Sequence, residues 1–327
     1  MYDIEKFYQA VDVKDAIRAL EADPSAVIIS GGSDVLIKIR EGKFAGCSLV
    51  SIHGIPELEG VRMEEDGTIV IGPATTFSHV TNNDIIMKHI PILGNAVDQA
   101  GGPQLRNIGT VGGNVCNGVT SADSASSFCV LDAILVLEGP KGTREVPIRE
   151  WYTGPGRTVR EHEEVLTAIK IRRESYEGFG GHYIKYGKRN AMEIATLGCA
   201  VTVKLSDDKR HVEEMQLGYG VAAPTPIRCF ETEEKVKGME IGEALYETVG
   251  KGALEEVNPR SSWRASKEFR LQLVEELGKR ALKQAIINAG GRQAAFGRQW
   301  RQPVKERRCA DGPPRPVRCG KRRVRRD

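Results

Sequence analysis

Apolar positions in the first forty residues follow two different patterns. Four apolar residues between 13 and 20 recur at helical spacing behind Asp12, a suitable N-cap, and this spacing predicts an amphipathic helix that ends before Pro24. The apolar run at 27–29 predicts a buried strand, which leads directly into Ser-Gly-Gly-Ser-Asp at 30–34. We therefore expect a strand–helix–strand start in which a strand stops at a glycine turn.

The middle of the chain alternates between strand and helix patterns. Residues 68–72 and 133–137 are short apolar, β-branched runs that predict strands. Residues 85–100 have the apolar spacing of one or two helices. The chain up to about residue 175 is therefore predicted to be mixed α and β.

The pattern changes after residue 175. Residues 175–181 are rich in glycine and polar side chains and mark a candidate domain boundary. Alternation at 200–205 predicts a half-buried antiparallel strand, with 217–223 as its partner. Ser266 is placed to cap a long helix that ends at the glycine pair 290–291. The apolar stripe of that helix comprises Phe269, Leu273, Leu277 and Ala281.

The overall charge averages two unlike segments. The 327 residues contain 47 Lys or Arg and 44 Asp or Glu, a net charge of +3. Residues 292–327 hold thirteen basic and three acidic residues, a net charge of +10, so residues 1–291 hold 34 against 41, a net charge of −7. A basic segment suggests a nucleic-acid partner, but this one is rich in Arg and Pro without apolar periodicity, a disordered composition.

Cysteine and histidine spacing predicts no metal site. The seven cysteines form no CxxC or CxxxxCxxC pattern, and the six histidines form no HExxH. No apolar run approaches the roughly 18 residues of a membrane helix, and the first ten residues lack the basic and apolar regions of a signal peptide. An odd number of cysteines without such a signal fits reduced thiols. We expect a cytoplasmic protein with no membrane partner.

Two glycine clusters suggest phosphate binding. Residues 101–118 hold six glycines in 18 positions, and the turn at 30–34 is built from similar residues. Glycine lets successive backbone N–H groups turn toward an anion. Neither cluster is a GxGxxG or GxxxxGK[ST] motif, and each alone also reads as an ordinary turn. Together they favour a phosphate clamp.

Longer motifs carry a family resemblance. VIISGGSD at 27–34 and LRNIGTVGGN at 105–114 are accompanied by GPATT at 72–76, GVAAPTPIRC at 220–229 and PRSSWRASKEFR at 259–270. The chain resembles the FAD-binding (medium) subunits of molybdenum hydroxylases, and among them those of bacterial xanthine dehydrogenases. The resemblance covers about residues 1–291.

The resemblance implies an α+β fold. It predicts a two-part FAD-binding region of the vanillyl-alcohol-oxidase (PCMH) type at 1–176, followed at 177–291 by a C-terminal domain with a small antiparallel sheet and a helical bundle. FAD is expected to lie between these parts. Residues 292–327 are interpreted as an aberrant, frame-shifted extension without a role, or alternatively as a basic arm that binds an acidic partner.

The resemblance also implies cofactor-binding residues. The backbone of 27–34 and 109–113 would hold the pyrophosphate, the Thr110 hydroxyl and Asn114 would bind phosphate or ribityl oxygens, and Asp123 would bind a polar part of the cofactor. The full expected set is Val27, Ile28, Ile29, Ser30, Gly31, Gly32, Ser33, Asp34, Gly109, Thr110, Val111, Gly112, Gly113, Asn114, Asp123, Val165, Ile184 and Lys185.

Other readings of these residues stay open. Asp123 could be a solvated loop carboxylate or a helix cap, and Lys185 with Arg189 a surface pair. Val165 and Ile184 are core residues on any reading, and their contact with a flavin ring is an added claim. Many relatives have Ala-Ser-Pro-x-Ser-Asp after the second loop, whereas this chain has Gly-Val-Thr-Ser-Ala-Asp at 118–123, so the proline is missing.

The function implied is electron transfer within a multi-subunit enzyme. A molybdenum-cofactor subunit would hydroxylate a purine, a two-iron two-sulfur subunit would carry electrons to FAD on this chain, and NAD+ would accept a hydride. No catalytic side chain is assigned, because the cofactor performs the redox chemistry. One alternative is the same subunit in an enzyme acting on carbon monoxide, nicotinate or an aldehyde. The alternative from another class is a basic-tailed nucleic-acid-binding protein.

Overall fold

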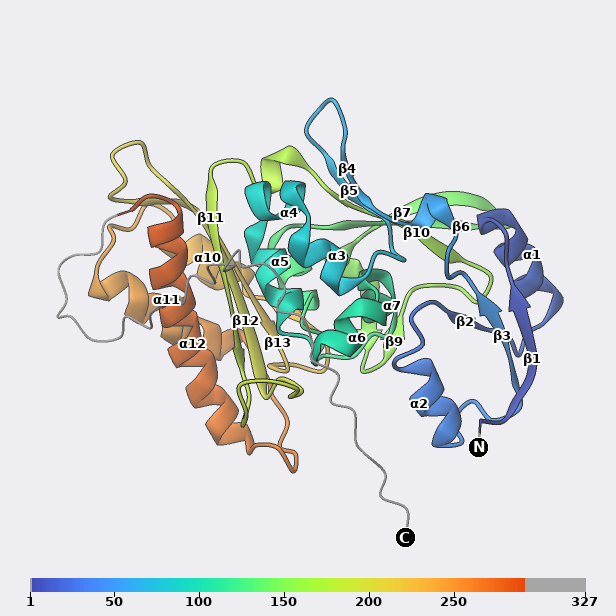
Figure 1. Ribbon diagram of the computed structural model, residues 1–327. Helices are drawn as coiled ribbons and strands as arrows, with labels where there is room; N and C mark the ends of the chain where they lie inside the picture. Colours follow the sequence, from blue (N-terminus) through green and yellow to red (C-terminus); the bar gives the residue numbers. More distant parts are fainter. Residues whose placement is uncertain (1, 292–327) are drawn as a thin grey trace, which may run out of the picture. The chain divides into compact units, whose positions relative to one another are not determined.

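The computed structural model describes residues 2–291 (Figure 1). The basic segment 292–327, for which the sequence predicts disorder, lies outside the described residues. The strands are β1 (Ile4–Gln9), β2 (Val27–Ile29), β3 (Cys47–Ser51), β4 (Val61–Met63), β5 (Ile69–Ile71), β6 (Ile134–Gly139), β7 (Gly142–Pro147), β8 (Tyr152–Gly154), β9 (Arg157–Thr158), β10 (Val165–Ile171), β11 (Phe179–Tyr186), β12 (Leu197–Leu205), β13 (Val212–Gly220) and β14 (Ile227–Arg228).

Most of the helices are short. The α-helices are α1 (Val13–Ala22), α2 (Val35–Arg40), α3 (Phe77–Asn82), α4 (Asp84–His89), α5 (Pro91–Asp98), α6 (Pro103–Ile108), α7 (Val111–Cys116), α8 (Ala125–Val130), α9 (Ile148–Trp151), α10 (Phe230–Val236), α11 (Glu243–Glu256) and α12 (Lys267–Asn288). Two single 3-10 turns are η1 (Pro56–Leu58) and η2 (Arg173–Ser175). Within residues 2–291, no helix combines the length and apolar character needed to cross a membrane.

A small parallel sheet forms the N-terminal part. Its strand order is β1-β3-β2, and both outer strands run parallel to β3. The predicted strand–helix–strand start is confirmed, and Asp12 caps α1 by accepting from the backbone N–H of Asp15 at 2.7 Å. Ligands bind open parallel sheets at the carboxyl ends of the strands. The turn at 30–34 follows the carboxyl end of β2 and is therefore placed for binding.

A second, antiparallel sheet has the order β4-β5-β10-β6-β7. The strands predicted at 68–72 and 133–137 are β5 and β6, and the helical pattern at 85–100 is divided between α4 and α5. This sheet and the short helices bury one continuous core that includes Leu93 and Trp151. The two sheets form the two-part N-terminal region expected from the sequence.

The third sheet, β11-β12-β13-β14, is antiparallel and covered on both faces. Alternate residues of β12, such as Val201, join the core beneath α12, whereas Ala200 joins the core that contains α5 and α8. The prediction of a half-buried strand is thus wrong. The polar Thr202 is tolerated because it donates to Gln216 on β13 and is buried with it. β13 also starts and ends earlier than predicted, at Val212–Gly220.

Helix α12 lies along β11 and β12 (Figure 1). Ser266 caps it as predicted, accepting from the N–H of Phe269 at 3.2 Å, and Gly290 at φ +84° follows its end. The predicted stripe is wrong at its first position, because Phe269 is 39% exposed and Arg270 only 2%. The candidate boundary at 175–181 already contains the start of β11, where a Cβ added to Gly180 would lie 2.2 Å from the backbone nitrogen of Ala289.

Candidate functional site

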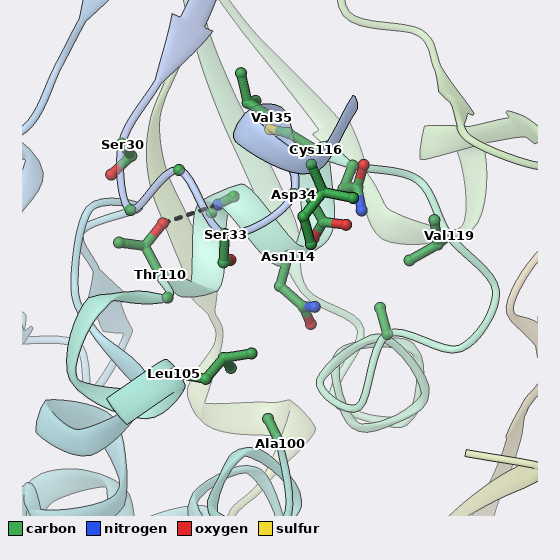
Figure 2. Close-up of a pocket in the computed structure, with 18 of the residues that line it drawn as sticks. Ser30, Ser33, Asp34, Val35, Ala100, Leu105, Thr110, Asn114, Cys116 and Val119 are labelled. Atoms are coloured by element: carbon green, nitrogen blue, oxygen red, sulfur yellow. Dashed lines mark hydrogen bonds between the residues drawn. The ribbon is translucent and has the colours of Figure 1, made fainter. Parts of the chain in front are cut away.

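A cavity of about 970 Å³ opens at the carboxyl end of the parallel sheet. Its walls come from the β2–α2 connection, from the stretch between Ala100 and Asp123, and from residues around β9 and β10. Figure 2 shows Ser30, Ser33, Thr110 and Asn114 on these walls. The C-terminal part contributes only Met192, Glu193 and Ile194 among the described residues, so the cavity lies mainly within the N-terminal region.

The turn after β2 presents unused donors to this cavity. Gly32 has φ +73°, which favours glycine, and the turn leads into α2. The backbone N–H groups of Gly31, Gly32, Ser33 and Asp34 donate to no acceptor within residues 2–291. Gly31, Gly32 and Ser33 are partly buried and Asp34 is exposed, and all four line the cavity. Four successive free N–H groups on a cavity wall therefore suit an anionic ligand.

The second glycine cluster is a turn between two short helices rather than one long loop. Gly109 and Thr110 separate α6 from α7, and Thr110 Oγ1 accepts from the N–H of Gly113 at 3.2 Å (Figure 2). A Cβ on Gly112 would lie 2.3 Å from Pro73 Cβ, so this glycine allows α7 to pack against Pro73. A Cβ on Gly113 would approach only Thr110 Oγ1. Gly113 therefore keeps part of the cavity open.

The two glycine clusters touch through their backbones. A Cβ added to Gly31 would lie 1.9 Å from the carbonyl oxygen of Ile108 and 3.2 Å from Gly109 Cα. Any side chain at Gly31 would separate these segments, because both neighbouring atoms belong to the backbone. The structure thus brings together two clusters that lie about 80 residues apart in the sequence.

Two buried polar atoms on the cavity wall have no partner in the described part of the chain. They are Ser30 Oγ and Asn117 Nδ2. Asn117 Oδ1 accepts from Lys38 Nζ, and the Lys38 ammonium lies 5.8 Å from the centre of the Phe44 ring. An unpartnered buried polar group is costly, so both atoms fit a ligand that supplies hydrogen-bond partners. Sequence reasoning missed Lys38 and Asn117, because their contact joins α2 to the end of α7.

Asn114 is held in a fixed orientation. Its Oδ1 accepts from Ser124 Oγ at 2.6 Å and from the Ser124 backbone N–H at 3.4 Å. The Asn114 side-chain amide N–H groups are thereby left as its donors toward the cavity. The connection at 118–123, which departs from the proline-containing pattern, starts at Gly118 with φ +66°. Glycine permits this turn without the missing proline.

Asp123 is part of a buried polar cluster. Its carboxylate accepts from Tyr183 Oη at 3.1 Å and from Lys185 Nζ at 2.8 Å, and Lys185 also donates to the carbonyl oxygen of Gln99. Burial raises the pKa of Asp123, and the adjacent Lys185 ammonium opposes that rise by favouring the carboxylate. The side chains of Asp123 and Lys185 are only 11% and 8% exposed. They form neither a solvated carboxylate nor a surface pair.

Arg189, by contrast, is exposed. It forms an ion pair with Glu193 at 3.0 Å and donates to the carbonyl oxygen of Met192. Its guanidinium is two-thirds exposed, which matches the surface reading of this residue rather than a role in the cavity.

Fourteen of the eighteen expected cofactor-binding residues line the cavity. They are Val27, Ile28, Ser30, Gly31, Gly32, Ser33, Asp34, Gly109, Thr110, Gly112, Gly113, Asn114, Asp123 and Val165. The side chains of Ile29 and Val111 instead point into cores beside the cavity, and Ile184 packs against the C-terminal core. Lys185 reaches the wall only through Asp123.

The cavity is built for binding rather than for side-chain nucleophilic chemistry. Cys116 lies on its wall, and burial raises the pKa of this thiol to about 11, so it stays protonated at neutral pH. Residues 2–291 contain no group of three His, Cys, Asp or Glu side chains placed to hold a metal ion. The free N–H groups and the unpartnered amide and hydroxyl suit the phosphate and hydroxyl oxygens of a dinucleotide.

Comparisons with known proteins agree with this site. Residues 2–172 match the family model "FAD binding domain in molybdopterin dehydrogenase", and residues 182–285 match "CO dehydrogenase flavoprotein C-terminal domain". The chain is 41% identical to the xanthine dehydrogenase FAD-binding subunit of Escherichia coli O157:H7 over 89% of this chain and 99% of that protein. It is 33% identical to the nicotinate dehydrogenase FAD-subunit of Eubacterium barkeri over 69% and 79% of the two chains.

A solved structure confirms the architecture. A chain in the structure of carbon monoxide dehydrogenase from Hydrogenophaga pseudoflava superposes with a TM-score of 0.83 at 26% identity, covering 88% of this chain and 99% of that one. The α+β fold, with an FAD-binding part followed by an antiparallel sheet and helices, is therefore confirmed. The chain belongs to the molybdenum hydroxylase family, as one of its FAD-binding subunits.

Proposed function

We propose that this chain is the FAD-binding subunit of a xanthine dehydrogenase and passes electrons from a partner's iron–sulfur clusters to NAD+. The 41% identity to a xanthine dehydrogenase subunit extends over nearly that whole protein, whereas identity to the nicotinate dehydrogenase subunit is 33% over a smaller share. An electron pair removed from the purine would reach NAD+ as a hydride. Bound FAD supplies the redox chemistry, and the protein positions the cofactor.

The four free N–H groups at Gly31–Asp34 carry the assignment of the pyrophosphate site. A hydrogen bond to a charged phosphate oxygen contributes about 1.5–3 kcal/mol. The turn at Gly109–Thr110 lies directly against Gly31. The expectation that the backbone of 109–113 supplies several donors is wrong, because the N–H groups of Gly109 and 111–113 already donate within the protein. Only the Thr110 N–H of this turn, which has no acceptor within residues 2–291, can add to the donors at 31–34. Ser30 Oγ and Asn117 Nδ2 would gain the partners that they lack within the protein. These residues would therefore bind the FAD pyrophosphate mainly through backbone and neutral side-chain hydrogen bonds, with few cationic side chains.

The Asp123–Lys185 pair would bind a hydroxyl-bearing part of FAD. Tyr183 donates to Asp123 Oδ1 and Lys185 to Asp123 Oδ2, and each oxygen can accept one more hydrogen bond from a ligand in the cavity that Asp123 lines. Lys185 offsets the negative charge that would otherwise repel the nearby phosphates. Val165 offers an apolar contact for the ring system, whereas we assign no such contact to Ile184, because it packs in the C-terminal core.

We further propose the assembly that this function requires. The partners would be a molybdenum-cofactor subunit and a two-iron two-sulfur subunit, in the cytoplasm, with residues 1–176 and 177–291 as the two domains of this chain. Support comes from relatives named as subunits or medium chains of larger enzymes. Neither nucleic acid nor a membrane enters this proposal.

The test is the activity of the complex purified through a tag on this chain. We expect xanthine to reduce NAD+ in the presence of the complex, and nicotinate, carbon monoxide and aldehydes to be poor substrates. NADH formation with one of these and none with xanthine would assign the chain to another molybdenum hydroxylase. If xanthine reduces only a dye and never NAD+, the proposed acceptor is wrong.

A pair of variants isolates the contribution of FAD. Gly113→Val places a branched side chain in the cavity and should abolish NAD+ reduction, while xanthine still reduces a dye that accepts electrons upstream of the flavin. Gly242→Ala is the matched control, because an added Cβ there meets no atom within 4 Å. Unchanged NAD+ reduction by the FAD-free Gly113→Val complex would contradict electron transfer through this site.

A further inference from the structure

An exposed aromatic and basic surface lies outside the cofactor cavity. It comprises Tyr186, Lys188, Met192, Trp263, Arg264 and Phe269, and is called here the Trp263 surface. Trp263 is 77% exposed and Met192 66%. The Tyr186 and Phe269 rings meet edge to face at 5.8 Å, and Lys188 Nζ lies 5.5 Å from the centre of the Trp263 ring. These contacts make the β11–β12 hairpin and the start of α12 one surface, at the same end of the third sheet (Figure 1).

The charge of this surface is opposite to that of the body around it. Without the buried Arg270, residues 187–196 and 258–269 together contain five Lys or Arg and two Asp or Glu, a net charge of +3. Residues 1–291 as a whole carry −7. A second copy of the chain would bring the same positive surface against this one, which repulsion disfavours. The complementary occupant is an acidic protein face.

A buried arginine fixes the loop that presents Trp263. The Arg270 guanidinium donates to the carbonyl oxygens of Thr196 and Arg260 and to Ser262 Oγ. Within residues 2–291 the acceptors of Arg270 are two carbonyl oxygens and a hydroxyl rather than a carboxylate, and burial together with Arg260 and Arg264 lowers the pKa of Arg270. Burying a guanidinium without a carboxylate partner lowers the stability of the fold. In return, the hydrogen bonds of Arg270 hold residues 260–263 in one conformation.

The fixed loop makes Trp263 a suitable anchor for binding. The Arg264 guanidinium lies 4.3 Å from the centre of its ring and the Lys188 ammonium 5.5 Å, so cations flank the indole while most of it stays exposed. Trp, Tyr and Arg dominate the binding energy of protein interfaces. A preordered anchor also loses less conformational entropy on binding.

We propose that the Trp263 surface docks an acidic face of the iron–sulfur partner subunit in the enzyme complex. The inference rests on the proposed function, which requires such a partner. Met192, in the same β11–β12 hairpin as Lys188, is exposed and also lines the cofactor cavity. A subunit docked on the Trp263 surface would therefore reach the edge of the cavity, where an electron carrier needs to be.

The test uses the full complex purified through a tag on this chain, with Trp263→Ala and Arg264→Glu made separately and together. Iron and molybdenum are measured per FAD at increasing salt. We expect the double variant to weaken association by about tenfold or more, so that iron and molybdenum per FAD fall. FAD per tagged chain should stay unchanged, because neither residue lines the cavity.

Matched controls lie at the other end of the sheet. Ile287→Ala removes an exposed apolar side chain about 27 Å farther along α12 than Phe269. Lys209→Glu reverses an exposed charge in the β12–β13 turn. Both controls should keep the iron and molybdenum content of the unaltered complex.

Three results would overturn the inference. The first is an iron and molybdenum content in the double variant that equals the unaltered one at every salt concentration. The second is a Trp263-dependent dimer of this chain in light scattering, and the third is Trp263-dependent binding to duplex DNA, each with the metal content unaffected. Loss of FAD from the unaltered chain would instead contradict the proposed function, so the two failures are distinguishable.

Discussion

Gly31 is the residue at which the two halves of the cofactor cavity touch. A Cβ at this position would lie 1.9 Å from the Ile108 carbonyl oxygen, and a backbone oxygen in a turn cannot rotate aside as a side chain would. Gly32 and Ser33, in the same turn, line the cavity, and their N–H groups have no acceptor within residues 2–291. A single methyl group therefore changes both the packing of the turns and the geometry of the donors.

We predict that Gly31→Ala weakens FAD binding at least about a hundredfold, since losing two phosphate hydrogen bonds costs about 3 kcal/mol or more. Equilibrium titration of the apoprotein with FAD measures this. Gly242→Ala is the control, because its backbone is extended at φ −175° and its surroundings are open. Equal affinity of Gly31→Ala and the control would show that the turns do not hold the cofactor.

Gly113, in α7, lines another wall of the cavity. Its added Cβ would lie 2.9 Å from Thr110 Oγ1, the cap of α7, so this hydroxyl has to shift. The Cβ meets no other atom outside its own helix, so the side chain otherwise fills space that belongs to the cavity. We predict that Gly113→Val folds but loses FAD during purification, whereas Gly113→Ala retains part of it. Circular dichroism and released FAD are the two readouts. A folded Gly113→Val protein with its full FAD content would place the cofactor elsewhere.

At the scale of single residues, the sequence predicts turns and helix caps better than it predicts side-chain contacts. The glycine turn at 30–34 and the caps Asp12 and Ser266 could be predicted, because turns and helix starts depend on residues next to one another. The contact of Gly31 with Ile108 could not, because it joins segments about 80 residues apart. The Lys38–Asn117 contact and the unpartnered Ser30 hydroxyl could not. The first arises only when α2 and the end of α7 meet, and the second depends on what surrounds the end of β2 in the folded chain. No local pattern in the sequence indicates either.

Among the elements, β11 connects the cofactor site to the C-terminal core. Tyr183 and Lys185 hold Asp123, while Gly180 allows α12 to approach the strand. His182 lies between them, opposite Val201 of β12, and burial lowers the pKa of His182. Protonation of the buried His182 imidazole is therefore less favourable in the folded chain than in the unfolded chain.

We predict a corresponding pH dependence of stability. Because the pKa of His182 is lower in the folded than in the unfolded chain, the folded protein binds fewer protons, and its stability is full above about pH 6.5 and falls below it. On lowering the pH from about 7.5 to about 5.5, the free energy of unfolding should decrease less for His182→Gln than for the unaltered protein. Urea unfolding midpoints at both pH values measure this, and identical pH-dependent losses would contradict it.

The exposure of individual residues in β12 and α12 was predicted wrongly where another part of the chain packs over them. The alternation in β12 predicts one polar face, but α5 and α8 cover that face, so Thr202 and Gln216 are buried and pair with each other. The stripe of α12 likewise predicts Phe269 inside, whereas Arg270 is buried because backbone carbonyls of a neighbouring loop accept from it. Both errors come from neighbours outside the element itself, which its own periodicity does not reveal.

For the whole molecule, the net charge of +3 describes no single part. The body of residues 1–291 carries −7, and the appended segment 292–327 carries +10. The described body contains the entire cofactor cavity and the Trp263 surface. We therefore propose that the basic segment contributes to neither cofactor binding nor assembly.

We predict that truncation after Gly291 leaves FAD content and the recovery of partner subunits unchanged. Gly291 packs against Ile286 and Leu205, so truncation after it keeps the end of α12 in place. Released FAD, iron and molybdenum are measured for the full and the shortened chain. Loss of the partner subunits alone would assign a docking role to residues 292–327.

The most direct test of the central claim is the FAD content of the purified chain. We predict a yellow protein that releases about one FAD per chain on denaturation, and an apoprotein that takes up added FAD to the same level. A colourless protein that takes up no FAD, while remaining folded by circular dichroism, would contradict the assignment of this cavity to FAD.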